Sequence, residues 1–162
     1  MTKKFADEFD SLLLALYLLP FGTTHIIVVI VYYFTTEFNK IMPKKILIVE
    51  DYADARSFMK ILIESYGYET IEAADGEQAV QTVQQEQPDL ILMDLAMPIM
   101  DGLAATRVIR GFDKTAKLPI IAVTAHGKSF YKQAIEAGCD DMISKPIDFA
   151  VLEPVLNQYL GH

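Results

Sequence analysis

Five polar residues stand at or just after the ends of apolar runs, and their types are those that handle phosphate and metal ions. Glu50 and Asp51 follow the run Ile-Leu-Ile-Val, and Asp94 follows Leu-Ile-Leu-Met. Thr124 follows Ile-Ile-Ala-Val, and Lys145 comes two residues after a shorter apolar run. If each run is a buried strand of one parallel sheet, the five side chains meet at the edge where the strands end. The spacing therefore predicts one site that contains three carboxylates, a hydroxyl and an amine.

Such a set of side chains suits a metal ion and phosphoryl transfer. Three crowded carboxylates repel one another unless a cation lies between them. Ligands that are all oxygen select Mg²⁺, or alternatively Mn²⁺, and these ions also bind phosphate oxygens. The metal and Lys145 would hold the charge that develops on the phosphoryl group while Thr124 donates a hydrogen bond. One carboxylate could act as the nucleophile and form an aspartyl-phosphate, but spacing alone does not say which.

The elements that must position these residues alternate regularly from Lys44 onward. Short apolar runs alternate with segments of helical periodicity, which predicts an α/β fold: a doubly wound five-stranded parallel sheet with helices on both faces. The expected strands are Ile46–Val49, Thr70–Ala73, Leu90–Met93, Ile120–Val123 and Met142–Ile143. The expected helices are Ala53–Ser65, a segment from the Asp75–Gly76 turn to about Gln85, Gly102–Arg110, Lys128–Ala137 and Asp148–Leu160.

The last of these helices contains a proline. Pro154 lies six residues after Asp148, and a proline inside a helix removes a hydrogen bond and clashes with the preceding turn, at a cost of about 3 kcal/mol. We therefore expect the regular helix to begin near Leu152, with Pro154 in its first turn, or to be kinked at the proline.

Residues 1–43 form an apolar N-terminal segment of a different composition. Residues 11–36 carry no Asp, Glu, Lys or Arg, and 18 of the 23 residues in 12–34 are apolar, enough for a helix to cross a bilayer. A proline, a glycine and a histidine near the middle argue against a simple span. Three interpretations stay open: a membrane anchor with the following lysines on the cytoplasmic side, an apolar hairpin or helix packed on the domain or on a second chain, or an over-long start before Met42.

Composition narrows the function classes. The net charge is −8, and such an acidic surface disfavours nucleic acid as a partner. The single cysteine, Cys139, excludes a disulfide scaffold and a cysteine-based zinc site and is typical of a reducing compartment. Because Cys139 follows Gly138 where a small residue packs, we expect it to fill core space rather than to act in redox chemistry.

The motifs match a known family. Glu50-Asp51, then Asp94-Leu-Ala-Met-Pro-Ile-Met-Asp-Gly102, then Thr124-Ala125, then Lys145-Pro146 resemble the receiver domain of bacterial two-component response regulators. The resemblance covers about residues 44–162. It implies a flavodoxin-like fold of five βα units with strand order 2-1-3-4-5.

The resemblance also implies a role for each site residue. Asp94 would be the phosphoacceptor, Thr124 the switch hydroxyl and Lys145 the lysine that binds the phosphoryl group. The implied metal ligands are the carboxylates of Glu50, Asp51 and Asp94 and the main-chain carbonyl of Ala96. The bond between Lys145 and Pro146 matches a family bond that is usually cis. Met142 departs from the family, which usually carries an aromatic residue three positions before the lysine.

The implied activity is that of a signalling protein rather than an enzyme. A receiver accepts its phosphoryl group from the phosphohistidine of a histidine kinase or a histidine phosphotransfer protein and acts in the cytoplasm on a downstream protein. Because the chain ends at His162 directly after the last helix, we expect a stand-alone receiver that acts by protein contact.

The motifs of other protein families with this architecture match the sequence less well. A flavodoxin needs a phosphate-cradling loop after the first strand, where Glu50 and Asp51 would repel phosphate. An aspartate-nucleophile phosphatase would carry a second aspartate at the position of Ala96. A degenerate receiver that serves as a phosphorylation-independent scaffold is the alternative, and the intact set of site residues speaks against it.

Overall fold

The computed structural model describes residues 43–125 and 130–161. Within these residues, five parallel strands form one sheet in the order β2-β1-β3-β4-β5, which confirms the predicted fold and strand order. The strands are β1 (Lys45–Val49), β2 (Glu69–Ala73), β3 (Leu90–Asp94), β4 (Ile120–Thr124) and β5 (Asp141–Ser144). The helices are α3 (Ala53–Ser65), α4 (Gly76–Glu86), α5 (Gly102–Arg110), α6 (Tyr131–Ala137) and α7 (Phe149–Leu160), with a short 3-10 helix η1 (Asp113–Thr115).

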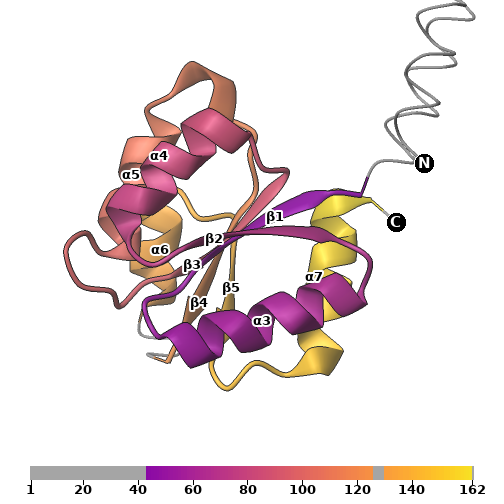
Figure 1. Cartoon of the computed structure of the whole chain (residues 1–162). Helices are drawn as coiled ribbons and strands as arrows, with labels where there is room; N and C mark the ends of the chain where they lie inside the picture. Colours follow the sequence, from indigo (N-terminus) through magenta and orange to yellow (C-terminus); the bar gives the residue numbers. More distant parts are fainter. Residues whose placement is uncertain (1–42, 126–129, 162) are drawn as a thin grey trace, which may run out of the picture. The chain divides into compact units, whose positions relative to one another are not determined.

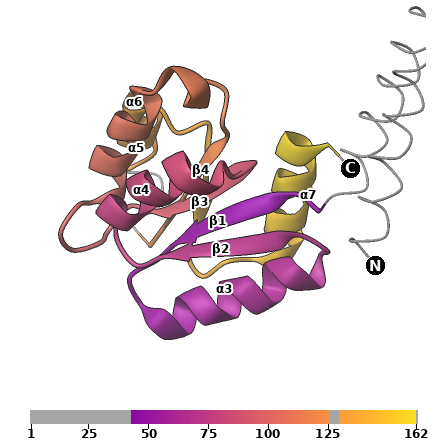
Figure 2. The same cartoon turned by 45° about the horizontal axis from the view of Figure 1, so that its top comes forward.

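Helices cover both faces of the sheet. Figure 1 shows α3 and α7 on one face and α4, α5 and α6 on the other, and Figure 2 shows the same arrangement from a second direction. Successive side chains of a strand point to opposite faces, so β1 contributes Ile46 and Ile48 to the core beneath α3 and α7. It contributes Leu47 and Val49 to the core beneath α4, α5 and α6. The continuous apolar runs of the central strands follow from this burial on both faces.

The predicted helix over residues 128–137 begins later than expected. Among the described residues it starts at Tyr131, because Phe130 lies outside the helix and its carbonyl accepts the first helical hydrogen bond, from the Ala134 N–H at 2.9 Å. Residues 128 and 129 lie outside the described part. Apolar spacing does not fix a helix start this closely.

The prediction that the last regular helix begins near Leu152 is wrong. α7 begins at Phe149, because the Asp148 carboxylate accepts from the Ala150 N–H at 2.9 Å and the Asp148 carbonyl accepts from the Leu152 N–H at 3.0 Å. The helix is therefore capped before it reaches Pro154 and continues through it. Pro154 and Ala150 are both exposed, so water can bind the carbonyl that the proline leaves without a helical partner. A kink at Pro154 stays a prediction.

The part of the chain that the structure describes contains no helix long and apolar enough to cross a membrane. The predicted membrane contact through residues 12–34 lies outside the described residues, as do the other interpretations of residues 1–42.

Candidate functional site

The candidate site lies where the chain leaves two neighbouring strands for opposite faces of the sheet. β1 leads into α3 on one face, and β3 leads into α5 on the other (Figure 1). Such a switch point leaves a crevice beyond the carboxyl ends of the two strands. Glu50 and Asp51 directly follow β1, and Asp94 is the last residue of β3. The sheet thus places all three predicted carboxylates at this switch point.

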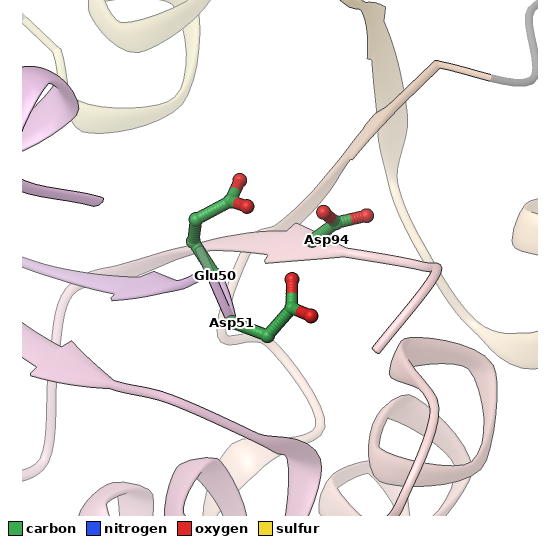
Figure 3. Close-up of side chains that lie close together, drawn as sticks. All are labelled: Glu50, Asp51 and Asp94. Carbon is green, nitrogen blue, oxygen red and sulfur yellow. The ribbon is translucent and has the colours of Figure 1, made fainter. Parts of the chain in front are cut away.

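The three carboxylates lie close together. One oxygen atom from each of Glu50, Asp51 and Asp94 lies within 4.8 Å of the others, and Figure 3 shows the two side chains at the end of β1 beside Asp94. Glu50 is 3% exposed and Asp94 is 5% exposed, whereas Asp51 is open to solvent. Two negative charges are therefore largely removed from water, which is costly unless a cation is near.

Lys145 is one such cation. Its Nζ donates to Glu50 Oε2 at 2.6 Å and to Asp94 Oδ2 at 2.5 Å. Burial alone would lower the pKa of Lys145, but the hydrogen bonds and negative charges of Asp94 and Glu50 outweigh burial and raise the pKa above its ordinary value. The ammonium is therefore charged at neutral pH. Counted formally, the three carboxylates and the one ammonium carry a net charge of −2.

The loop after β3 is folded tightly against Asp94. The Ala96 N–H donates to Asp94 Oδ1 at 2.9 Å, and the Gly102 N–H donates to the Leu95 carbonyl at 3.2 Å. A Cβ atom on Gly102 would lie 2.1 Å from the Asp94 carbonyl oxygen, so only glycine lets α5 begin this close to the strand. The loop fixes one carboxylate oxygen of Asp94 and brings the main chain of Ala96 beside it. That the Ala96 carbonyl is a metal ligand stays a prediction.

Thr124 and Lys145 lie on the other side of Asp94. The register of β3 and β4 pairs Asp94 with Val123, so Thr124, which is fully buried, is the next residue along the neighbouring strand. The Thr124 carbonyl accepts from the Lys145 N–H at 2.8 Å. The peptide bond between Lys145 and Pro146 is cis, as the resemblance implies. The structure therefore gathers Thr124 and Lys145 at the strand ends beside the acidic residues.

Arg56 is a neighbour of the site that motif spacing does not reveal. It lies in the first turn of α3, and its Nη1 donates to the main-chain carbonyl of Glu50 at 2.7 Å. This contact depends on how a long side chain folds back over the preceding loop. The only sequence signal is a basic residue within about two helical turns of the acidic pair.

Two other residues of the sequence analysis lie in or against the core. Cys139 is buried, and this burial raises the pKa of its thiol, as expected of a residue that fills core space. Met142 on β5 is half-buried and packs against the core beneath α4, α5 and α6.

Comparisons with known proteins agree with this geometry. The model of the response regulator receiver domain matches residues 46–157. The polar-differentiation response regulator DivK of Brucella anthropi is 38% identical over 121 residues, which cover 74% of this chain and 98% of that protein. DivK of Brucella ovis is 36% identical over the same shares of the two chains.

Solved structures of receiver domains share the fold. A receiver domain of a sensor histidine kinase from Pseudomonas aeruginosa, which holds a magnesium ion in its active-site cleft, matches with a TM-score of 0.70 at 34% identity, covering 75% of this chain and all of that one. A chemotaxis response regulator of Vibrio cholerae matches with a TM-score of 0.69 at 25% identity, covering 73% and 99%.

The family model covers most of the chain, and relatives more than 30% identical align along nearly their whole length. The chain belongs to the response regulator receiver domains, the phosphoacceptors of two-component signalling, as its sequence motifs predict.

Proposed function

We propose that Asp94 is the residue that accepts the phosphoryl group, and that the donor is a phosphohistidine of a histidine kinase or a histidine phosphotransfer protein. The supporting observation is the place of Asp94 in the sheet. Its strand lies between β1, which leads into the other two carboxylates, and β4, which ends in Thr124. Asp94 therefore lies between the other two carboxylates and Thr124, and its Oδ2 accepts from Lys145.

The transfer exchanges one bond to phosphorus for another. A carboxylate oxygen of Asp94 attacks the phosphorus atom, and the P–O bond forms as the P–N bond to the donor histidine breaks. The imidazole keeps the electron pair of the broken bond and, being protonated on its other nitrogen, leaves as neutral histidine. Lys145 pairs with Asp94 Oδ2 before the transfer. We expect it to pair with the phosphoryl group afterwards, with the Thr124 hydroxyl as the second donor.

The residues of the site fit a divalent cation. The donor set is oxygen alone, the three carboxylates converge within 4.8 Å, and Lys145 leaves two of their three formal charges uncompensated. Mg²⁺ fits these ligands, and Mn²⁺ is the alternative. We infer that Glu50, Asp51 and Asp94, together with the Ala96 carbonyl, hold the ion. When bound, it supplies positive charge to the phosphoryl oxygens.

The proposed output is a change of protein contact rather than catalysis of a substrate reaction. We propose that residues 44–162 form the receiver, that residues 1–43 are a separate apolar segment, and that the receiver works in a reducing, cytoplasmic setting. Among the described residues, no feature favours a scaffold that works without phosphorylation, because the acidic residues, the lysine and the hydroxyl are all in place.

Phosphorylation of the full chain tests the proposal. The protein is incubated with a small phosphodonor and Mg²⁺, and phosphate incorporation is followed by intact mass. Asp94→Ala should abolish acid-labile phosphate because it removes the nucleophile. Asp101→Ala is the matched control, since Asp101 ends the loop that follows Asp94 and its side chain caps α5 by accepting from the Ala104 N–H at 2.7 Å.

The outcomes separate the interpretations. Wild type and Asp101→Ala should both take up one phosphoryl group that hydroxylamine releases. Stable incorporation into Asp94→Ala would disprove the assignment of the nucleophile. No incorporation into the wild type from either a small phosphodonor or a histidine phosphotransfer protein would instead favour the scaffold.

A further inference from the structure

Arg56 joins the end of β1 to α3 and to the neighbouring strand. Its Nη1 donates to the Glu50 carbonyl oxygen at 2.7 Å and lies 3.5 Å from the Asp51 carbonyl oxygen. Its Nε donates to the Glu72 carboxylate of β2 at 3.2 Å. The side chain is 19% exposed, so these contacts are only partly open to water.

The Glu50 carbonyl belongs to the peptide group that joins Glu50 to Asp51. The Glu50 N–H donates to the Ala73 carbonyl at the end of β2, at 3.1 Å, so the main chain at Glu50 is held on both sides, by β2 and by Arg56. Figure 3 shows the two acidic side chains leaving adjacent main-chain positions in different directions. A change of the main-chain torsion angles beside this peptide would therefore turn the two side chains relative to each other and change the spacing of their carboxylates.

We propose that Arg56 is a positioning residue for the metal centre. By binding the carbonyl of the peptide between Glu50 and Asp51, its guanidinium holds the two carboxylates at the spacing that a divalent cation requires. The inference rests on the metal site proposed above. Removing a group that orients metal ligands typically lowers metal affinity by about 10–100-fold.

The charge of Arg56 and its hydrogen bond to the Glu50 carbonyl predict opposite changes in Mg²⁺ affinity when Arg56 is replaced. Loss of a positive charge beside an acidic cluster strengthens the binding of a cation by Coulomb attraction. Loss of the hydrogen bond to the Glu50 carbonyl weakens binding, because the ligands must then be ordered when the metal binds. A lower Mg²⁺ affinity in Arg56→Met therefore cannot arise from the change in charge.

The experiment is a titration of the full chain with MgCl₂ alone. The sequence contains no tryptophan, so binding is followed by calorimetry and by the amide NMR shifts of the site residues. We expect Arg56→Met to bind Mg²⁺ at least about tenfold more weakly than wild type. Arg56→Lys keeps the charge but offers a single ammonium for two acceptors, so its affinity should fall between those of Arg56→Met and wild type. Phosphorylation of Arg56→Met by a small phosphodonor should recover at saturating Mg²⁺.

Two variants serve as matched controls. Lys60 donates to the same Glu72 carboxylate at 2.9 Å, so Lys60→Met tests the loss of a cation from that cluster. Arg110 is 18% exposed and likewise donates to main-chain carbonyls, those of Gly138, Thr115 and Leu118. Arg110→Met thus tests general destabilisation by loss of a buried arginine. Both controls should stay within about twofold of the wild-type Mg²⁺ affinity. The hydrogen bonds of Lys60 and Arg110 go to residues other than the proposed metal ligands.

Equal or tighter Mg²⁺ binding by Arg56→Met would overturn the positioning role, provided that wild type binds and Asp51→Ala does not. An equal loss in Arg110→Met would also overturn it, because the loss would then reflect destabilisation. If wild type does not bind Mg²⁺, or if Asp51→Ala leaves the titration unchanged, the metal site itself fails, and the role of Arg56 fails with it.

Discussion

Replacing Lys145 with methionine should destabilise the protein when no divalent cation is present. The ammonium lies 2.6 Å from Glu50 Oε2 and 2.5 Å from Asp94 Oδ2, and both carboxylates are buried. Removing one partner of a buried ion pair costs about 3–5 kcal/mol, because the remaining charge is left uncompensated. The Lys145 side chain is 25% exposed, so water can take over part of its role. We therefore expect the free energy of unfolding to fall by about 2–3 kcal/mol.

Mg²⁺ should recover part of this loss. A ligand that binds only the native state stabilises it by about 2.7 kcal/mol when its concentration is 100 times its dissociation constant. Wild type obeys the same law, but its Lys145 already pairs with two of the carboxylates, compensates one of their charges and repels an incoming cation. The increase in unfolding free energy on adding Mg²⁺ should therefore be larger in Lys145→Met than in wild type.

Urea unfolding of the full chain, followed by circular dichroism with EDTA or with Mg²⁺, measures both effects. Lys60→Met is the control, because Lys60 and Glu72 form a more exposed pair of a kind that contributes only about 0–1 kcal/mol. Wild-type stability of Lys145→Met in EDTA would refute the argument that the lysine compensates buried charge. Equal stabilisation of both proteins by Mg²⁺ would refute the argument that lysine and metal share the same carboxylates.

The difference in unfolding free energy between wild type and Lys145→Met should also depend on pH, in a defined direction. The pKa of Lys145 is raised in the folded protein above 10.5, so the stabilisation it provides is fully present below that pH. It is lost only as the pH rises through the folded pKa. The difference between wild type and Lys145→Met should thus be constant from neutral pH to about pH 10 and should narrow above it.

Two predictions concern the loop after β3. Gly102→Ala places a Cβ 2.1 Å from the Asp94 carbonyl oxygen, so it should cost about 1–3 kcal/mol of unfolding free energy or more and slow phosphorylation. The control Gly111→Ala, whose Cβ would lie 3.2 Å from its nearest neighbour, should cost less in the same urea assay. Ile99 has a φ of 70° and is exposed, so Ile99→Gly should raise the unfolding free energy by about 1 kcal/mol. An unchanged urea midpoint would show that the left-handed backbone at this residue stores no strain.

The sequence predicts the sheet well because its strands are local patterns. Runs such as residues 46–49 and 90–93 are apolar without interruption, which is the pattern of a parallel strand buried on both faces. Because parallel strands all end at the same edge of the sheet, the residue that follows each run must lie at that edge. This is why the cluster of Glu50, Asp51 and Asp94 could be predicted before the structure was known.

The contacts of long side chains and the exact starts of helices could not be predicted in the same way. Arg56 reaches back to the Glu50 carbonyl, and no periodicity records that direction. The start of α7 depends on the Asp148 cap, whose two hydrogen bonds begin the helix before Pro154 can interrupt it. The intrinsic cost of an interior proline argued for a later start, but the capped first turn and the exposure of Pro154 outweigh it.

The contacts of Lys145 with the two buried carboxylates join residues that are distant in the sequence. Lys145 lies 95 positions from Glu50 and 51 positions from Asp94, and only the order of the strands brings them together. If Asp94 accepts the phosphoryl group as proposed, we expect Lys145 to exchange its bond to Asp94 Oδ2 for one to a phosphoryl oxygen. The Lys145 N–H is also bonded to the Thr124 carbonyl, so this exchange acts on the ends of both β4 and β5.

Met142 on β5 is flexible and has no rigid ring to switch between two rotamers. We therefore expect the change at this edge of the sheet to reach a partner protein through movement of the loops rather than through a ring flip.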